Sequence, residues 1–235
     1  MNDQFFIEAP KYIPVLTDDR GFWISVTLAA ITFLAVLVAL FQEKIKDHFR
    51  TAKLDMKINL SPPDCHQIAL TNSQNGSFIS NSIYIRLKVE HIEGDTAENV
   101  EIMLSNFWKI VGDNKHIIKE FLPMNLVWSH FQPRRTEIRV PRKLFRHCDF
   151  GYFVPFNDDQ GTILKLDTMV QPNPVAGGGL PNIIQPGKYE FELMLSGDNV
   201  KPLTKRWQLE FGRNWIEDES KMLESIKIIE GSVNK

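Results

Sequence analysis

The chain has only two cysteines among its 235 residues, Cys65 and Cys148. So few cysteines exclude the disulfide-rich frameworks of small secreted domains, where bridges take the place of a large core. Two free thiols are the simpler interpretation, although two cysteines also permit one bridge. The composition therefore predicts a domain held together by an ordinary hydrophobic core, and it is compatible with a reducing compartment.

An excess of positive charge is also lacking. The 27 lysines and arginines face 29 aspartates and glutamates, which gives a formal net charge of −2 and a pI near 6.3. Proteins that bind DNA or RNA usually gather a basic patch that neutralises phosphates. The balance of charge therefore argues against nucleic acid as the main partner.

Sequence motifs of catalysis are missing as well. There is no G-x-S-x-G nucleophile motif, and Gly177-Gly178-Gly179 lacks the Lys and Ser/Thr that complete a phosphate loop. Asp149-Phe150-Gly151 spells the metal-binding tripeptide of protein kinases, but the other kinase motifs do not accompany it. We therefore expect no cofactor and a non-enzymatic role, and we keep an enzyme with an unrecognised site as a third hypothesis.

Two Cys-His pairs invite comparison with a zinc site. They are Cys65-His66 and His147-Cys148, and together they contain two thiols and two imidazoles. Adjacent residues of a β-strand point to opposite faces, so each pair offers one ligand at most to a shared metal. The pairs are better explained as two buried or half-buried thiols with exposed imidazoles, and we expect no metal site.

One apolar run is long enough to cross a bilayer. Residues 22–41 contain no charged side chain, and Ser25, Thr27 and Thr32 are their only polar residues. A helix of this length covers about 30 Å, the thickness of the hydrocarbon core. The alternatives are a buried helix or a cleaved signal peptide, but a signal peptide has a basic start and a shorter apolar stretch. The run predicts a single transmembrane helix.

The flanks of this run predict its orientation, because the flank richer in Lys and Arg tends to stay in the cytoplasm. Residues 1–21 carry two basic residues amid several acidic ones, whereas basic residues are frequent after position 41. We therefore expect a single-pass inner-membrane protein with residues 1–21 outside and the C-terminal domain in the cytoplasm. The basic residues nearest the run on its C-terminal side are Lys44, Lys46, Arg50, Lys53 and Lys57.

A helical stalk is expected to follow the span over residues 42–54, where Ile45, Phe49 and Ala52 recur along one side. Its basic face makes it a candidate for contact with anionic lipid headgroups, and a solvated extension of the helix is the alternative. The candidate lipid-headgroup contacts are Lys44, Lys46, Arg50 and Lys53.

Residues 55–212 change to the pattern of β-structure, with short alternating segments between turns rich in Ser, Pro, Asn and Gly. In residues 83–90 the apolar residues Ile83, Ile85, Leu87 and Val89 alternate with polar ones, which indicates a half-buried antiparallel strand. About nine or ten such strands predict a mainly β fold, an antiparallel β-sandwich.

The C-terminal residues 213–235 are expected to form a helix and a tail. Asn214 and Glu217 resemble a capping box, and apolar residues recur at helical spacing over residues 215–230. Residues 226–231, IKIIEG, are also compatible with a strand.

Two segments, IYIRLKVEHIEGDTAENVEIML and IIQPGKYEFELMLSGDNVKPLTKRWQLEF, resemble the strand–loop–strand unit and the closing hairpin of CARDB-like and other immunoglobulin-like bacterial domains. The whole arrangement is similar to bacterial single-pass membrane proteins with such a domain. The resemblance implies an immunoglobulin-like sandwich and a membrane location, and it implies no activity.

The best candidate for a binding surface is a basic stretch that also carries aromatic residues, and a solvated charged face is the alternative. We expect a non-enzymatic interaction or sensing module that binds the bilayer and an unidentified protein, with self-association through the span left open. The alternative is a membrane effector that binds a small anionic ligand such as a nucleotide. The candidate partner or anion-binding residues are Arg134, Arg135, Arg142, Lys143 and Arg146.

Overall fold

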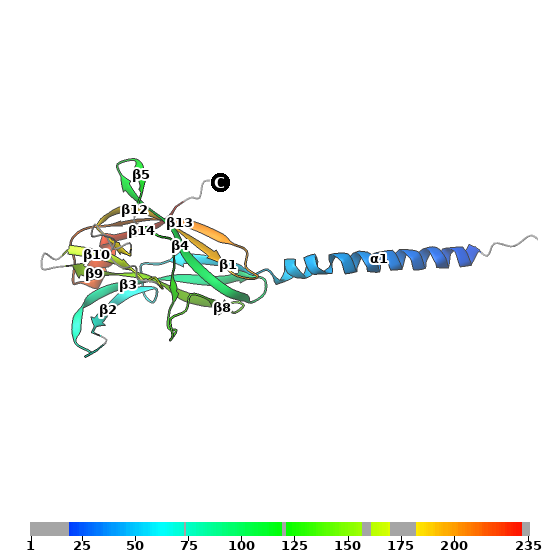
Figure 1. The fold of residues 1–235 in the computed structure, drawn as a ribbon, viewed down its shortest axis with the longest axis horizontal. Helices are drawn as coiled ribbons and strands as arrows, with labels where there is room; N and C mark the ends of the chain where they lie inside the picture. Colours follow the sequence, from blue (N-terminus) through cyan, green and yellow to red (C-terminus); the bar gives the residue numbers. More distant parts are fainter. Residues whose placement is uncertain (1–18, 73, 119–120, 157–160, 170–181, 232–235) are drawn as a thin grey trace, which may run out of the picture. The chain divides into compact units, whose positions relative to one another are not determined.

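The computed structural model describes residues 19–72, 74–118, 121–156, 161–169 and 182–231 of the chain (Figure 1). The chain divides into two compact units, Met1–Asp47 and His48–Lys235. Residues 1–18 of the expected outer tail and the glycine run 177–179 lie outside the described residues.

The first unit contains most of the helix α1 (Asp19–Arg50). Its segment Gly21–Gln42 is long and apolar enough to cross a membrane. The hydroxyls of Ser25, Thr27 and Thr32 donate to backbone carbonyls four residues earlier, at 3.0, 2.8 and 2.8 Å. The three polar side chains predicted to interrupt the apolar surface therefore find partners within the helix itself.

The second unit is mainly β, as the sequence predicts, and consists of two antiparallel sheets. In the first sheet the order is β1-β3-β9-β10-β11, with β2 beside β3 and β7 beside β9. In the second the order is β14-β13-β12-β4-β5, with β6 and β8 beside β4. The strands of the first sheet are β1 (Lys53–Ile58), β2 (Cys65–Thr71), β3 (Phe78–Glu93), β7 (Val127–Trp128), β9 (Phe145–Phe156), β10 (Gly161–Leu166) and β11 (Ile183–Ile184). Those of the second are β4 (Ala97–Val111), β5 (Asn114–Ile117), β6 (Met124–Asn125), β8 (Ile138–Val140), β12 (Gly187–Ser196), β13 (Leu203–Phe211) and β14 (Ile226–Gly231).

The long strand β3 organises the first sheet. Ile83, Ile85, Leu87 and Val89 are fully buried, which confirms the alternation predicted for this segment. Along one side, β3 pairs first with β2 and then with β1, and along the other it pairs with β9.

Aromatic rings join the two sheets in the core. The ring of Phe191 in β12 lies 4.8 Å from that of Phe150 in β9, and 5.8 and 5.6 Å from those of Phe107 and Trp207 in its own sheet. All four side chains are at most 2% exposed. Because large aromatic side chains bury the most apolar area, this group is a main source of the stability of the sandwich.

A lysine closes one side of the sandwich. The Lys205 ammonium of β13 lies 2.8 Å from the Asp55 carboxylate in β1 and 2.9 Å from the Glu230 carboxylate in β14. It also donates to the carbonyl oxygen of Met56 at 3.0 Å. The side chain therefore ties the edge of the first sheet to the second.

The helix ends earlier than the sequence predicts. Residues 42–54 were expected to be a helical stalk, but α1 ends at Arg50 and β1 begins at Lys53. Ala52, Leu54 and Met56 are buried at a spacing of two, which is the period of a strand. Burial of these side chains in the sandwich therefore overrides the helical spacing seen from Ile45 onwards.

The C-terminal helix is also shorter than predicted. The helix α2 covers Glu219–Ser225, and Asp218, not Asn214, caps it by accepting a hydrogen bond from the Lys221 N–H at 3.0 Å. Residues 226–231 form β14, which pairs with β13. The edge of β13 offers hydrogen-bond partners for the backbone along the whole segment, so residues 226–231 form a strand and do not continue the helix.

The described residues contain fourteen strands, more than the nine or ten expected. The difference comes mainly from two- and three-residue strands such as β6, β7, β8 and β11, which pair with longer neighbours. Such short segments carry no recognisable alternation.

Candidate functional site

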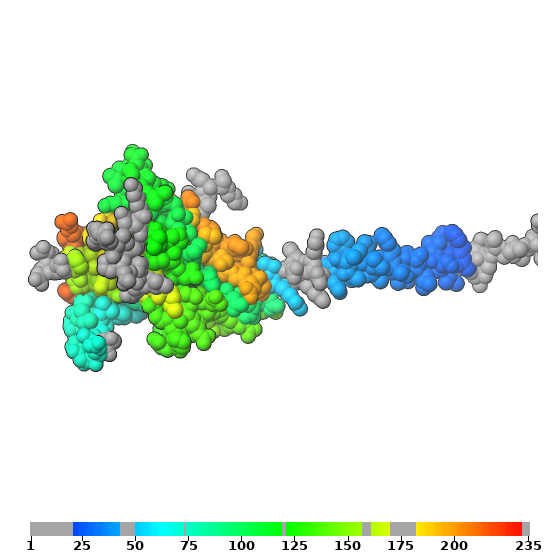
Figure 2. Space-filling model, viewed as in Figure 1, coloured from blue at the N-terminus to red at the C-terminus, as the bar shows by residue number. Residues whose placement is uncertain are grey.

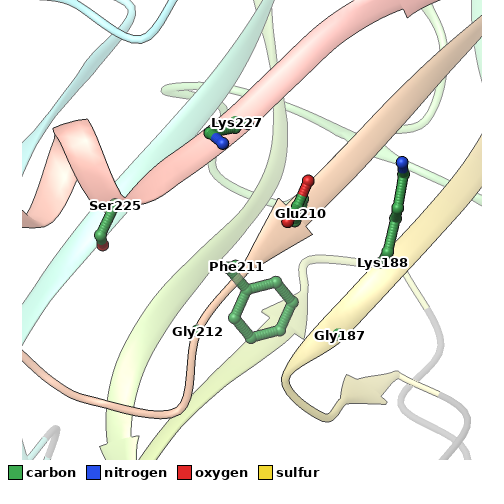
Figure 3. Close-up of a pocket in the computed structure, with 7 residues that line it drawn as sticks. All are labelled: Gly187, Lys188, Glu210, Phe211, Gly212, Ser225 and Lys227. Atoms are coloured by element: carbon green, nitrogen blue, oxygen red, sulfur yellow. The ribbon is translucent and has the colours of Figure 1, made fainter.

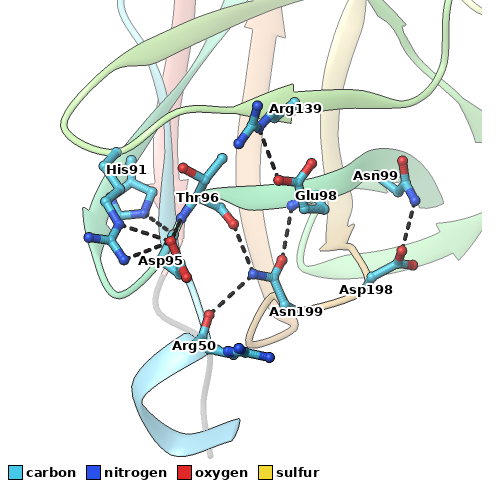
Figure 4. Close-up of polar contacts among 10 residues, drawn as sticks. Arg50, His91, Asp95, Thr96, Glu98, Asn99, Arg139, Asp198 and Asn199 are labelled. Carbon is cyan, nitrogen blue, oxygen red and sulfur yellow. Dashed lines mark hydrogen bonds and ion pairs between the residues drawn. The ribbon is translucent and has the colours of Figure 1, made fainter. Parts of the chain in front are cut away.

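The chain enters the sandwich at a polar junction, shown in Figure 4, which we call the entry end. It is formed by Arg50, Thr51, the turn 94–96 and residues 198–199. The Asn199 side chain joins three segments, because it donates to the carbonyl oxygens of Arg50 at 3.2 Å and Thr96 at 2.8 Å and accepts from the Glu98 N–H at 2.9 Å. The Asn199 side chain thus links Arg50, at the start of the domain, to the turn 94–96 and to the first residues of β4.

Backbone contacts fix the same junction. The Ala52 N–H donates to the Asn199 carbonyl at 2.7 Å, and the Lys201 N–H donates to the Ala52 carbonyl at 2.9 Å. Gly94 has a φ of +90°, and a Cβ at this position would lie 2.0 Å from the Thr51 carbonyl oxygen. Only glycine therefore allows the turn to approach Thr51 so closely.

Charged side chains surround the entry end. Arg142 pairs with Asp95 at 2.7 Å and Arg139 with Glu98 at 2.9 Å. Hydrogen bonds from the Thr96 N–H and then from Arg142 hold the pKa of the Asp95 carboxyl below its usual range, and the charge of Arg50 acts in the same direction. Arg50 and Arg142, which were predicted to belong to two separate surfaces, therefore act on one carboxylate.

The other predicted basic residues lie in several places. Arg134 forms an ion pair with Asp167, and the guanidinium of Arg135 lies 5.8 Å from the Phe131 ring. Lys143 is exposed in the loop before β9, and Arg146 is half-buried in β9. The predicted basic residues therefore lie in three places, with Arg142 at the entry end, Arg134 and Arg135 in the loop 129–137, and Lys143 and Arg146 at the start of β9.

The predicted lipid contacts are described only in part. Lys53 is exposed and pairs with Glu93 at 3.0 Å, and Arg50 is exposed at the end of α1. Lys44 and Lys46 belong to α1, but their side chains lie outside the described residues.

A second polar cluster covers the outer face of β3 and β9 in the first sheet. His147 Nε2 lies 2.6 Å from the Asp64 carboxylate, and the Arg86 guanidinium lies 3.1 Å from His130 Nε2 and donates to the Pro63 carbonyl. The remaining contacts are a Ser129 hydroxyl that donates to Asp149 and a Tyr84 hydroxyl that donates to Asp167 at 3.2 Å.

The environment shifts two groups of this cluster. Burial raises the pKa of the Asp149 carboxyl, although hydrogen bonds from Ser129 and Tyr84 oppose the shift. Burial also raises the pKa of the Tyr84 phenol, and the negative charges of Asp149 and Asp167 add to this effect. Raised carboxyl pKa values are common at catalytic sites, but paired structural networks produce them too.

The cluster fits a structural clamp, because its partners come from the sheet and from the two segments that cross it, residues 59–64 and 129–134. Sequence reasoning missed it. Arg86 was expected on a polar, solvent-facing side, yet it is only 9% exposed. The partners of Arg86 lie up to 44 positions away in sequence, and those of Tyr84 and His147 lie 83 positions away. No local sequence pattern can therefore predict these contacts.

The two Cys-His pairs are split as strand alternation predicts. Cys65 and Cys148 are fully buried free thiols in the core. The prediction of exposed imidazoles is wrong, because the His147 side chain, which binds Asp64, is only 12% exposed and His66 is half-buried. Within the part of the chain that the structure describes, no group of three His, Cys, Asp or Glu side chains could hold a metal ion.

A shallow groove of about 280 Å³ lies where β12, β13 and β14 meet (Figure 3). Lys188, Glu210 and Lys227 are cross-strand neighbours there, so two ammonium groups flank one carboxylate. The groove is at the lower limit of the size typical of small-molecule sites. Its lining residues are Gly187, Lys188, Glu210, Phe211, Gly212, Ser225 and Lys227.

No model of a protein family, no curated protein and no solved structure matches the chain.

Proposed function

We propose that this protein is a single-pass inner-membrane protein whose C-terminal β-sandwich is a cytoplasmic, non-enzymatic interaction module. The apolar segment Gly21–Gln42 supports the span, and the excess of basic residues on its C-terminal side supports the orientation. The immunoglobulin-like classification and self-association through α1 belong to the same proposal.

Exposed apolar side chains on two hairpins carry the proposed binding role. Phe78 and Ile79, at the start of β3, are each 62% exposed, and Ile117, at the end of β5, is 71% exposed. Figure 2 shows both hairpins, in cyan and green, standing out from the body of the sandwich. Exposed apolar groups on a rigid protruding element are typical of protein–protein contacts.

The positions of these hairpins suit a partner in solution. Glu93, at the other end of β3, is adjacent to Gly94 of the entry end, and the strand has sixteen residues. At about 3.3 Å per residue, Phe78 lies about 50 Å along the strand from the entry end. The β2–β3 hairpin is therefore at the end of β3 that is remote from the entry end. The β4–β5 hairpin is likewise at the remote end of β4, a strand of fifteen residues that begins directly after Thr96 of the entry end.

Photo-crosslinking in living cells tests this binding role. A photoreactive phenylalanine would replace Ile79 or Ile117, and Ile229, which is 61% exposed on β14, would serve as the matched control. We expect a discrete protein adduct from position 79 or 117 and not from 229. The absence of adducts at both hairpin positions, or the same adducts at all three, would contradict the role.

The alternative is a membrane effector that binds a small anionic ligand through the basic stretch. The geometry supports it less well, because Asp167 already neutralises Arg134 and Asp95 already neutralises Arg142. A ligand would have to compete with these ion pairs.

A further inference from the structure

We propose that the sandwich docks onto anionic lipid headgroups through a surface at its entry end, and this inference rests on the proposed membrane span. The surface combines apolar and basic side chains, and we call it the lipid-facing rim. Its members are Arg50, Ile92, Lys143, Leu144 and Phe145.

Strand pairing brings the apolar members together from distant parts of the chain. The His91 N–H donates to the Leu144 carbonyl at 3.0 Å, and Phe145 faces Glu90 in the register of β3 and β9. Ile92, Leu144 and Phe145 are 55%, 50% and 47% exposed. Three large apolar side chains thus lie exposed close to one another, Ile92 and Phe145 in the paired strands β3 and β9 and Leu144 directly before β9.

Basic residues accompany this apolar group. Arg142 and Lys143 directly precede Leu144, and Arg142 binds Asp95, next to the Gly94 that packs on Thr51. Six basic side chains accompany four acidic ones in residues 50–53, 92–99, 139–145 and 198–201, and Lys53, Arg139 and Arg142 form ion pairs with three of the acidic ones. Apolar groups beside an excess of basic ones are the usual composition of surfaces that bind anionic membranes. The basic side chains are Arg50, Lys53, Arg139, Arg142, Lys143 and Lys201, and the acidic ones are Glu93, Asp95, Glu98 and Asp198.

The length of the connection favours a bilayer over a soluble partner at this surface. The apolar segment ends at Gln42 and α1 ends at Arg50, so the helix continues for only eight residues beyond the apolar segment. At 1.5 Å per residue this connection is about 12 Å long. Asn199 and Gly94 then hold Arg50 and Thr51, where this connection ends, against the entry end.

Fluorescence quenching of the full-length chain in vesicles tests the rim. Cys65 and Cys148 are fully buried, so an introduced cysteine is the accessible thiol for a probe. A probe on Leu144→Cys reports on the rim, and a probe on Ala30→Cys reports on the span. A probe on Ile117→Cys, at a residue that is 71% exposed on the β4–β5 hairpin, is the control. The vesicles contain phosphatidylcholine alone or with an equal part of phosphatidylglycerol, and the quencher is attached to the lipid.

We expect the probe at position 144 to be quenched severalfold more than the probe at 117 in vesicles with phosphatidylglycerol, and less in phosphatidylcholine alone. Lys143→Gln should reduce the quenching at 144, whereas Lys227→Gln at the groove should not. If the probe at 30 is quenched but the probes at 144 and 117 are quenched equally weakly, the lipid-facing rim is contradicted while the proposed membrane span stands. Equal quenching at 144 in both kinds of vesicle would overturn the assignment to anionic lipid. Absence of quenching at 30 would overturn the proposed membrane span, and this inference with it.

Discussion

The side-chain amide of Asn199 donates to the carbonyl oxygen of Arg50, 3.2 Å away, across 149 positions of the sequence. This contact places the end of α1 against the loop between β12 and β13. The same side chain also binds Thr96 and Glu98 in the loop and strand that follow β3. The junction through which a membrane anchor would hold the domain is therefore fixed by specific hydrogen bonds.

Replacement of Asn199 by alanine should destabilise the domain. The change removes three hydrogen bonds, and a partner left without its bond costs about 1 to 3 kcal/mol. Denaturant unfolding of the full chain in detergent, followed by tryptophan fluorescence, measures the loss. Gln208→Ala, on the exposed side of β13, is the control and should unfold like the wild type. Equal midpoints for both variants would show that the junction does not contribute.

Two glycines allow a matched test of the turn at the entry end. Gly94 and Gly76 both have positive φ values, +90° and +69°, but only Gly94 has a neighbour in the way of a Cβ. Gly76→Ala should cost about 1 kcal/mol, which is the conformational penalty alone. Gly94→Ala should cost at least about 3 kcal/mol, because the turn must also move away from Thr51. Similar unfolding midpoints for the two variants would contradict the close approach.

The stability of the sandwich should depend on Glu90 in a defined pH window. Hydrogen bonds from Lys57 and then Lys88 lower the pKa of the Glu90 carboxyl to about 2. A lowered folded-state pKa stabilises the protein above the unfolded value, about 4.3, and this stabilisation disappears as the pH falls through 2. The wild type should therefore be more stable than Glu90→Gln between pH 5 and pH 7, and the difference should shrink towards pH 2. A difference that persists at pH 2 would exclude this origin.

Both cysteines should resist alkylation in the folded protein. Burial raises the pKa of the Cys65 thiol to about 12 and that of Cys148 well above its ordinary value. The thiolate is the reactive form, so iodoacetamide near pH 8 should modify neither residue within minutes. Mass spectrometry should show both modified after denaturation without reductant, since both are free thiols. Rapid modification of the folded chain would contradict their burial.

The strongly periodic parts of the fold could be predicted from sequence. The alternation of Ile83, Ile85, Leu87 and Val89 gave the strand β3, and the uninterrupted apolar run gave α1. Element ends were less predictable, because they depend on partners elsewhere. Ala52 was predicted to be helical but forms a β-bridge with Val200. Residues 226–231 were predicted to continue the helix but pair with the edge of β13.

The candidate sites show the same limit. Composition identified Arg50 and Arg142 as members of two separate basic surfaces, but only the folded chain places both near Asp95. The polar cluster of Arg86, Asp149 and His147 had no sequence signal, because an alternating polar residue looks the same in sequence whether water or another side chain covers it. Long-range pairing decides these features.

A pair of reporter fusions after Lys235 tests the central claim most directly, that one helix anchors a cytoplasmic sandwich in the inner membrane. The account predicts fluorescence from a green fluorescent protein fusion in the membrane fraction and no activity from an alkaline phosphatase fusion, which folds only outside the cytoplasm. Phosphatase activity would contradict the orientation, and fluorescence in the soluble fraction would contradict the anchor itself.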